Sequence, residues 1–437
     1  MLTTGTTRSH KMPMAFPPPA YTAAPPAPSY SRNPAHDEVT MEITPRAGES
    51  PTGVYVKRST SCGDVLVLAE QEPNAERPVY GHRGVVSGLI GIEDRKTVQT
   101  VVLKVEGTMD SMTFEGGSSR QRLFNNTHTL WLSSSSSPST SPCPGSLPFS
   151  IPLPTRFRDE NLMAHPLPPS YDVPFSTNLG MFLNIRYSIS VTITRARSLG
   201  LPFLSKTSTI VVPFDYRPGS RPRQPALLSF DLLEDVKIMP EEFKQVSWDV
   251  EPRPKALAVS HPPPLKVDLF LSTAEGFALD DPIPFHVQLA GPADALSQFI
   301  PRRTSSTAPT SPTQNPQQGI TVSLVREFTI EVNDRKAART MTLASVSFQP
   351  DSESLSSGAV TTLDFSGTVK PDRALAPTGE FDVGCVRLQD FVVVELWPVD
   401  AETRRGYTTL QFSHRIKLVT NSYVEGSPGI RYEQLPS

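Results

Sequence analysis

The sequence predicts an all-β fold: two immunoglobulin-like antiparallel β-sandwich domains, preceded by a disordered proline-rich arm. Three observations predict it. Short segments with apolar residues at every second position recur along the 437-residue chain, turn-forming residues separate them, and helical patterns are scarce. Such segments are typical of antiparallel sheets that bury one face and expose the other.

The arm is expected over residues 1–50. This segment contains the run AFPPPAYTAAPPAPSYSRNP and no periodic apolar pattern. It cannot bury enough apolar surface to offset the entropy lost on ordering. The whole chain holds 46 prolines, roughly twice the usual share of about 5%. Proline is poor in helix interiors and central strands, so turns, strand ends and linkers must be frequent.

A first sandwich is expected over residues 51–218. Its clearest strand is NIRYSISVTITRAR, in which apolar and polar residues alternate. The apolar face of this strand holds Ile185, Tyr187, Ile189, Val191 and Ile193. The segments LPFSIPLP and PLPPSYDVP are expected at sheet edges, because proline cannot donate a ladder hydrogen bond. Residues 133–146 are expected to form a flexible serine-rich loop.

A second sandwich is expected over residues 219–424, with a polar loop at 302–318 and a short tail at 425–437. The boundary lies in YRPGSRPRQP, which has no apolar face. We expect a solvated linker there, with an arginine docking patch as the less favoured alternative. Single helical turns are expected in EEFKQV and DALSQFI.

Two polar residues fall on apolar faces of this second half. Arg326 shares a face with Leu324 and Phe328. Either it is buried against a carboxylate, or a β-bulge returns it to water. His414 lies in an apolar segment, and we expect a core or rim histidine, because no second His or Cys lies at ligand spacing.

The sequence contains no pattern that indicates catalysis, a cofactor or a metal. P-loop, GxGxxG, GxSxG and HExxH motifs are missing from it. The neighbouring carboxylates of Asp280 and Asp281 should point to opposite faces, which makes them poor acid–base partners. We therefore expect no enzyme; a jelly-roll enzyme or lectin is the least favoured alternative.

Composition bears on partners and location. The formal net charge of −3 argues against a nucleic-acid binder, which needs clustered lysine and arginine. Three cysteines lie far apart, which indicates reduced thiols. The sequence shows neither a secretory signal nor a run of about 18 apolar residues. A cytoplasmic protein is expected.

Several segments follow one another in an order that resembles the fungal arrestin-like, or α-arrestin, family. They are RPVYGHRGVVSGLIGIEDRKTVQTVVLKVEG, HTLWLS, LPFSIPLP, LPPSYDV, IRYSISVTITR, VPFDYRP and SHRIKLVTNSY. The resemblance covers about residues 54–424. It implies the two-sandwich fold and the work of a monomeric adaptor. Such adaptors bind cytoplasmic parts of membrane transporters or receptors, which recruit them to the plasma membrane or endosomes. They also recruit WW-domain HECT ubiquitin ligases, so that the cargo is endocytosed and sorted.

A PPxY sequence in the arm fits that recruitment. It consists of Pro18, Pro19 and Tyr21 around Ala20. WW domains bind such segments because polyproline II is preformed and costs little entropy to order. Better-known α-arrestins carry PPxY motifs in long C-terminal tails, unlike this sequence. A scaffold or sorting-complex subunit that recruits no ligase is therefore the alternative function.

A second PPxY sequence lies inside the first sandwich. It comprises Pro168, Pro169 and Tyr171. It is the weaker candidate for WW-domain binding, because the family often has a similar structural corner at this place. We expect Tyr171 to be packed there, with its hydroxyl bonded to backbone.

A basic pair near the start of the first sandwich is the candidate for cargo or phosphate contact. Lys57 and Arg58 resemble the family segment where such a pair meets phosphates on receptor tails. Charge-assisted hydrogen bonds would suit that role. An ordinary solvent-facing strand end is the alternative.

Overall fold

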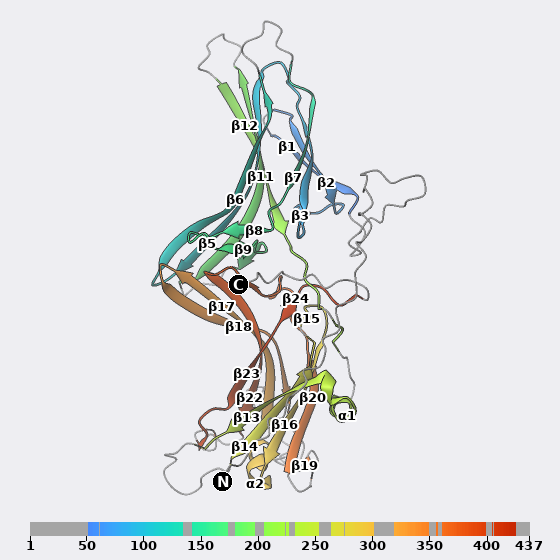
Figure 1. Ribbon diagram of the computed structural model, residues 1–437, viewed down its shortest axis with the longest axis vertical. Coiled ribbons are helices and arrows are strands. Elements are labelled where there is room, and N and C mark those ends of the chain that lie inside the picture. The colour runs from blue at the N-terminus through green and yellow to red at the C-terminus, as the bar shows by residue number, and fades with distance from the viewer. Residues whose placement is uncertain are drawn as a thin grey trace, which may run out of the picture. The chain divides into compact units, whose positions relative to one another are not determined.

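Strands make up most of the described chain and confirm the prediction of an all-β sandwich fold (Figure 1). The computed structural model describes residues 51–60, 62–133, 142–173, 180–196, 205–222, 224–226, 232–252, 264–274, 276–300, 319–348, 355–356, 361–398, 404 and 406–424. The arm 1–50, the loop 302–318, the tail 425–437 and most of the loop 133–146 lie outside these residues.

Strands β1 to β12 form what we call the N-terminal half. They are β1 (Gly53–Arg58), β2 (Val65–Gln71), β3 (Val79–Tyr80), β4 (Val85–Gly91), β5 (Val98–Thr113), β6 (Gly117–Leu132), β7 (Ser146–Pro152), β8 (Arg156–Arg158), β9 (Ala164–Pro166), β10 (Tyr171–Val173), β11 (Phe182–Ala196) and β12 (Ser205–Tyr216). One sheet has the order β1-β2-β4-β7. The facing sheet has the order β3-β12-β11-β5-β6, with β10 also on β11, and β8 pairs with β9.

Alternation in the sequence explains how these two sheets pack. Strand β11 buries every second residue from Ile185 to Ile193, and its neighbour β5 buries Val101, Leu103 and Val105. The register places Ile189 opposite Val105, so the apolar faces of the two strands coincide. Burial of this shared face removes apolar surface from water and stabilises the sandwich. The proline-containing strand β7 lies at a sheet edge, as predicted.

The C-terminal half consists of strands β13 to β24 and four short helical segments. The strands are β13 (Phe243–Val250), β14 (Leu265–Ser272), β15 (Phe277–Ala278), β16 (Ile283–Gly291), β17 (Gly319–Val332), β18 (Arg335–Phe348), β19 (Leu355–Ser356), β20 (Thr361–Val369), β21 (Phe381–Asp382), β22 (Val386–Trp397), β23 (Gln411–Ile416) and β24 (Leu418–Val419). The helical segments are α1 (Leu232–Ile238), η1 (Pro240–Glu242), α2 (Ala293–Leu296) and η2 (Ser297–Phe299). One sheet has the order β13-β14-β16-β20-β19, and the other has the order β18-β17-β22-β21 with β23 on β22.

Two short pairs are parallel rather than antiparallel. Strand β3 runs parallel to β12, and β15 runs parallel to β24. Each of these pairs has only two paired positions. The other strand pairs of the described residues are antiparallel.

The helical expectations had different outcomes. DALSQFI forms α2 and η2, which confirms the prediction there. The prediction for EEFKQV is wrong beyond Glu242, because Phe243 begins strand β13. Phe243 is buried in a small apolar cluster with Leu232 and Phe270, and β13 pairs along β14. Tertiary pairing outweighs the weak local helix preference of this segment.

Strands β17 and β22 contribute to both large hydrophobic cores of the described residues. The core between the N-terminal sheets also contains the ends of these two strands, whereas their other ends lie in the core of the C-terminal half. In β17 the change falls between Leu324 and Phe328, and in β22 between Leu388 and Val392. The predicted boundary at residues 218 and 219 is not tested by this sharing and stays a prediction.

Candidate functional site

The predicted basic pair lies at an open sheet edge. Strand β1 pairs with β2 along one side and is the outermost strand of its sheet in the described chain. Lys57 and Arg58 are exposed, and within the described residues neither forms an ion pair. Val54 and Val56 of the same strand are 55% and 47% exposed. An edge strand offers unpaired backbone groups to another extended segment.

The second PPxY sequence is part of the core. Pro168 and Pro169 are buried, and Tyr171 is 1% exposed. The ring of Tyr171 lies 5.9 Å from that of Phe328 and 6.0 Å from that of Phe381, which both come from the C-terminal half. The prediction that Tyr171 is packed is confirmed. A WW domain cannot reach a tyrosine buried in this way.

The predicted backbone bond belongs to a different tyrosine. Tyr187 of β11 donates its hydroxyl proton to the carbonyl oxygen of Pro168 at 2.5 Å. The hydroxyl of Tyr171 has no hydrogen-bond partner among the described residues, so that part of the prediction is wrong. Burial raises the pKa of Tyr171, and the nearby charge of Arg326 opposes this shift. In this corner Tyr187 therefore hydrogen-bonds to the backbone, whereas Tyr171 contributes packing.

Arg326 is buried against a carboxylate, the first of the two alternatives. Its Nε and Nη2 donate to Asp390 Oδ1 and Oδ2 at 2.8 and 3.0 Å, and its Nη1 donates to the Thr378 carbonyl at 2.8 Å. Both charged side chains are 0% exposed. A register shift does occur between Leu324 and Val325 on the β18 side, but it leaves Arg326 buried. The pair sits at the point where β17 and β22 pass from one core to the other.

His414 of β23 is a rim histidine, as predicted. Its side chain is half-buried, while Phe412 and Ile416 on either side are buried. Burial, and then the charge of Lys244, lower the pKa of His414.

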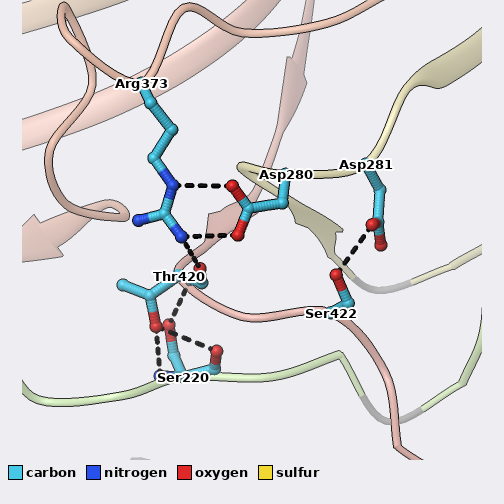
Figure 2. A network of polar contacts seen from close by, with 6 residues as sticks. All are labelled: Ser220, Asp280, Asp281, Arg373, Thr420 and Ser422. Carbon is cyan, nitrogen blue, oxygen red and sulfur yellow. Dashed lines mark hydrogen bonds and ion pairs between the residues drawn. The ribbon is translucent and has the colours of Figure 1, made fainter.

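The stretch after β12 is solvated only in part: Arg217, Gln224 and Pro225 are exposed, as a solvated linker would be, whereas two of its prolines are packed. Pro218 and Pro222 are buried. Ser220 N–H donates to Thr420 Oγ1 at 2.8 Å, and Thr420 Oγ1–H donates back to the Ser220 carbonyl at 3.1 Å (Figure 2). These bonds tie the linker to the residue that follows β24. Two buried prolines and these hydrogen bonds therefore fix part of the stretch against the C-terminal half.

The neighbouring carboxylates of Asp280 and Asp281 have separate partners, as Figure 2 shows. Arg373 donates through Nε and Nη2 to Asp280 at 2.7 and 2.5 Å, and Nη2 also reaches the Thr420 carbonyl at 3.3 Å. Ser422 donates its hydroxyl proton to Asp281 at 2.7 Å. Hydrogen bonding from Arg373 lowers the pKa of Asp280.

Next to this network lies a groove of about 550 Å³ with mixed polar and apolar walls. Its walls come from β10, β11 and β12 of the N-terminal half, and from residues 373–378 and Thr420 of the C-terminal half. Four arginines line it: Arg77, Arg186, Arg217 and Arg373. Lys57 and Arg58 belong to the other sheet of the N-terminal half, so the structure does not place them in this groove.

Comparison with protein-family models and with curated proteins finds no match.

The described residues hold neither a disulfide nor a cluster of metal-binding side chains. Cys62, Cys143 and Cys385 form no disulfide within the described residues. Within the described ranges no group of three or more His, Cys, Asp or Glu side chains is placed to hold a metal ion. No helix in the same ranges has the length and apolar character needed to cross a bilayer. The arm motif of Pro18, Pro19 and Tyr21 lies outside the described residues.

The groove was not predicted as a site. Arg217 belongs to the stretch for which an arginine docking patch was the less favoured alternative, and Arg186 lies on the polar face of β11. Arg77 and Arg373 carry no signal in the sequence, since they lie in loops far apart along the chain. Only tertiary structure brings the four side chains to one place.

Proposed function

We propose that this chain is a non-enzymatic adaptor of the kind that its resemblance to α-arrestins implies. It binds cytoplasmic regions of membrane transporters or receptors and links them to ubiquitin-ligase-dependent endocytosis and sorting. It works as a monomer in the cytoplasm and reaches the plasma membrane or endosomes through its cargo. The sandwich fold supports this proposal, because exposed sheet edges suit the binding of extended peptides.

The observation that carries the proposal is the open edge of β1. An extended cargo tail adds to this edge through backbone hydrogen bonds, which give affinity without a strict sequence requirement. The exposed Lys57 and Arg58 side chains then meet phosphates or carboxylates on the tail. Exposed Val54 and Val56 offer apolar contact along the same strand.

The test is charge reversal at this edge, read by fluorescence anisotropy with labelled transporter-tail peptides in phosphorylated and unphosphorylated forms. Lys57→Glu/Arg58→Glu should weaken binding of phosphorylated tails about tenfold or more. The matched control is Arg335→Glu/Lys336→Glu, an exposed basic pair at the start of β18, another outermost strand. Equal loss in both double variants, or no loss in either, would remove β1 as the cargo site.

Ligase recruitment is assigned to the arm motif of Pro18, Pro19 and Tyr21. Isolated WW domains should capture the wild-type chain and the Tyr171→Phe variant equally, and should fail to capture Tyr21→Ala. Tyr171→Phe is a suitable control because it keeps the buried ring in place. Equal capture of Tyr21→Ala would rule out recruitment through the arm.

A scaffold or sorting-complex subunit without a ligase is the second candidate. Burial of Pro168, Pro169 and Tyr171 favours it, because this removes one of the two PPxY sequences from use. Unchanged cargo ubiquitination after deletion of the gene, together with a stable complex with sorting proteins, would select this candidate over the first.

A further inference from the structure

The groove beside Arg373 has the dimensions of a small-molecule site. Its volume of about 550 Å³ falls within the range of about 300 to 1,000 Å³ that is usual for ligand pockets. Both halves of the described chain build its walls. A ligand there would contact β10 to β12 on one side and the segment 373–378 on the other.

Arginines are the basic residues of these walls, and each of them has a carboxylate partner. Four arginines line the groove, and their side chains are between 48% and 67% exposed. The acidic residues of the lining are Asp172 and Asp215, and Asp110 and Asp280 pair with Arg186 and Arg373 beside it. An anion is favoured by the arginine donors that these carboxylates leave unused, not by net charge.

These arginines keep hydrogen-bond donors for a ligand although each has an acidic partner. A guanidinium has five N–H donors, and a carboxylate occupies about two of them. Arg373 uses Nε and Nη2, and its Nη1 points away from Asp280 without a contact in the described residues (Figure 2). Arg217 bonds to Asp215 through Nη2 at 2.7 Å. The remaining forked donors match the oxygens of a phosphate group.

Two buried polar atoms of the lining lack partners in the described residues. They are the hydroxyl oxygen of Tyr171, which is 1% exposed, and Oδ1 of Asn184, which is 8% exposed. Asn184 Nδ2 donates to Asp172 Oδ1 at 3.3 Å, which fixes Oδ1 as the unpaired atom of the amide. Leaving such atoms unpaired costs free energy, so each such atom calls for an explanation. Oδ1 can accept a hydrogen bond from a ligand, and the phenol can donate one.

We propose that this groove binds a small phosphorylated molecule that also carries hydroxyl groups. The free arginine donors and the Tyr171 hydroxyl bind phosphate oxygens, and Asn184 Oδ1 accepts a hydrogen bond from a ligand hydroxyl. The volume of about 550 Å³ favours a small molecule over a peptide or a nucleic acid. The site is distinct from the β1 edge, and it stands whether or not the chain is an adaptor.

Calorimetric titration of the full chain with fructose 1,6-bisphosphate, pyrophosphate and unphosphorylated fructose tests this proposal. We expect saturable binding of both phosphorylated probes, tighter for the sugar bisphosphate, and none for fructose. Added salt should weaken binding, because it screens charge. Saturable binding of fructose, or of neither phosphorylated probe, would overturn the proposal.

Variants locate the binding. Arg77→Gln/Arg217→Gln should weaken pyrophosphate binding and raise its dissociation constant about tenfold or more. Both side chains are more than half exposed, so the fold should survive. Arg387→Gln/Arg415→Gln removes two ion-paired surface arginines outside the lining and should change nothing. Equal loss in both double variants would mean general charge attraction and would contradict the site.

A further experiment distinguishes two sources of the phosphate, a lipid headgroup and a soluble molecule. Flotation of the chain with phosphatidic acid vesicles, lost in Arg77→Gln/Arg217→Gln, would assign the phosphate to a lipid headgroup. Pyrophosphate binding without flotation would assign it to a soluble molecule. Capture of phosphorylated peptides in preference to both phosphorylated small molecules, with the same dependence on the arginines, would overturn the small-molecule assignment.

Discussion

Arg326 of β17 and Asp390 of β22 face each other across neighbouring strands, with neither side chain exposed to solvent. The carboxylate takes two of the donors of the guanidinium, and the Thr378 carbonyl takes another. Taking charges out of water is costly, and mutual attraction offsets that cost only while both partners are present. The pair therefore makes the junction of the two cores sensitive to the loss of one side chain.

Asp390→Ala should destabilise the fold strongly. An unpaired buried arginine typically costs about 3 to 5 kcal/mol. Urea unfolding measures the loss, and Asp382→Ala is the control, because Asp382 and Arg387 form an ion pair that is about half exposed. That control should cost about 1 kcal/mol or less. The apolar double variant Arg326→Met/Asp390→Leu should recover most of the stability; a double variant as unstable as Asp390→Ala would contradict this explanation.

Tyr187→Phe and Tyr171→Phe should differ, although they remove the same hydroxyl. Tyr187→Phe leaves the buried Pro168 carbonyl without its donor, which should cost about 1 to 3 kcal/mol. Tyr171→Phe removes an unpartnered hydroxyl and should leave the free energy of unfolding unchanged or slightly higher. Thermal and urea unfolding of the two variants check this, and equal losses would contradict the hydrogen-bond assignment.

His414 should make stability fall on acidification. Its pKa is lower in the folded chain than the ordinary value, so the folded state binds this proton less readily than the unfolded state does. The contribution is therefore present above about pH 6.5 and is lost as the pH falls below that value. Between about pH 7.5 and about pH 5.5 the wild-type chain should lose more stability than His414→Gln. Parallel pH profiles of the two proteins would show that His414 is not the cause.

Thr420→Val should loosen the stretch after β12. It keeps the side-chain shape but removes both hydroxyl bonds to the Ser220 backbone, at a cost of about 1 to 2 kcal/mol. Hydrogen–deuterium exchange should become faster at the Ser220 amide. Thr408→Val is the control, because its hydroxyl bonds to the Glu251 carbonyl at another place in the C-terminal half. Unchanged exchange at Ser220 in Thr420→Val would contradict the role of this bond.

The strand faces could be predicted because alternation is a property of local backbone geometry. Val101, Leu103 and Val105 are buried together for that reason, and so are the apolar residues of β11. Arg326 shows the limit of this reasoning. Its place on an apolar face was evident from the sequence, but its partner Asp390 lies 64 residues away. No local pattern selects one carboxylate over another at that separation.

The groove could not be predicted for the same reason. Its arginines occupy a loop, a polar strand face, a linker and a second loop, and each position alone is ordinary for a charged residue. The assignment of EEFKQV failed differently. There a local helix preference was present, but pairing with β14 and burial of Phe243 determined the outcome.

The sharing of β17 and β22 between two cores has a consequence for any attempt to produce the halves separately. A polypeptide stopped after residue 218 would keep both N-terminal sheets but would lose apolar side chains that complete their interior. Those side chains are Phe328, Ile330, Val332, Val383, Val386 and Leu388. The truncated polypeptide would expose the apolar interior of its sandwich to solvent, and self-association or chaperone binding would follow. The N-terminal half should therefore be stable only when it is expressed together with the C-terminal half.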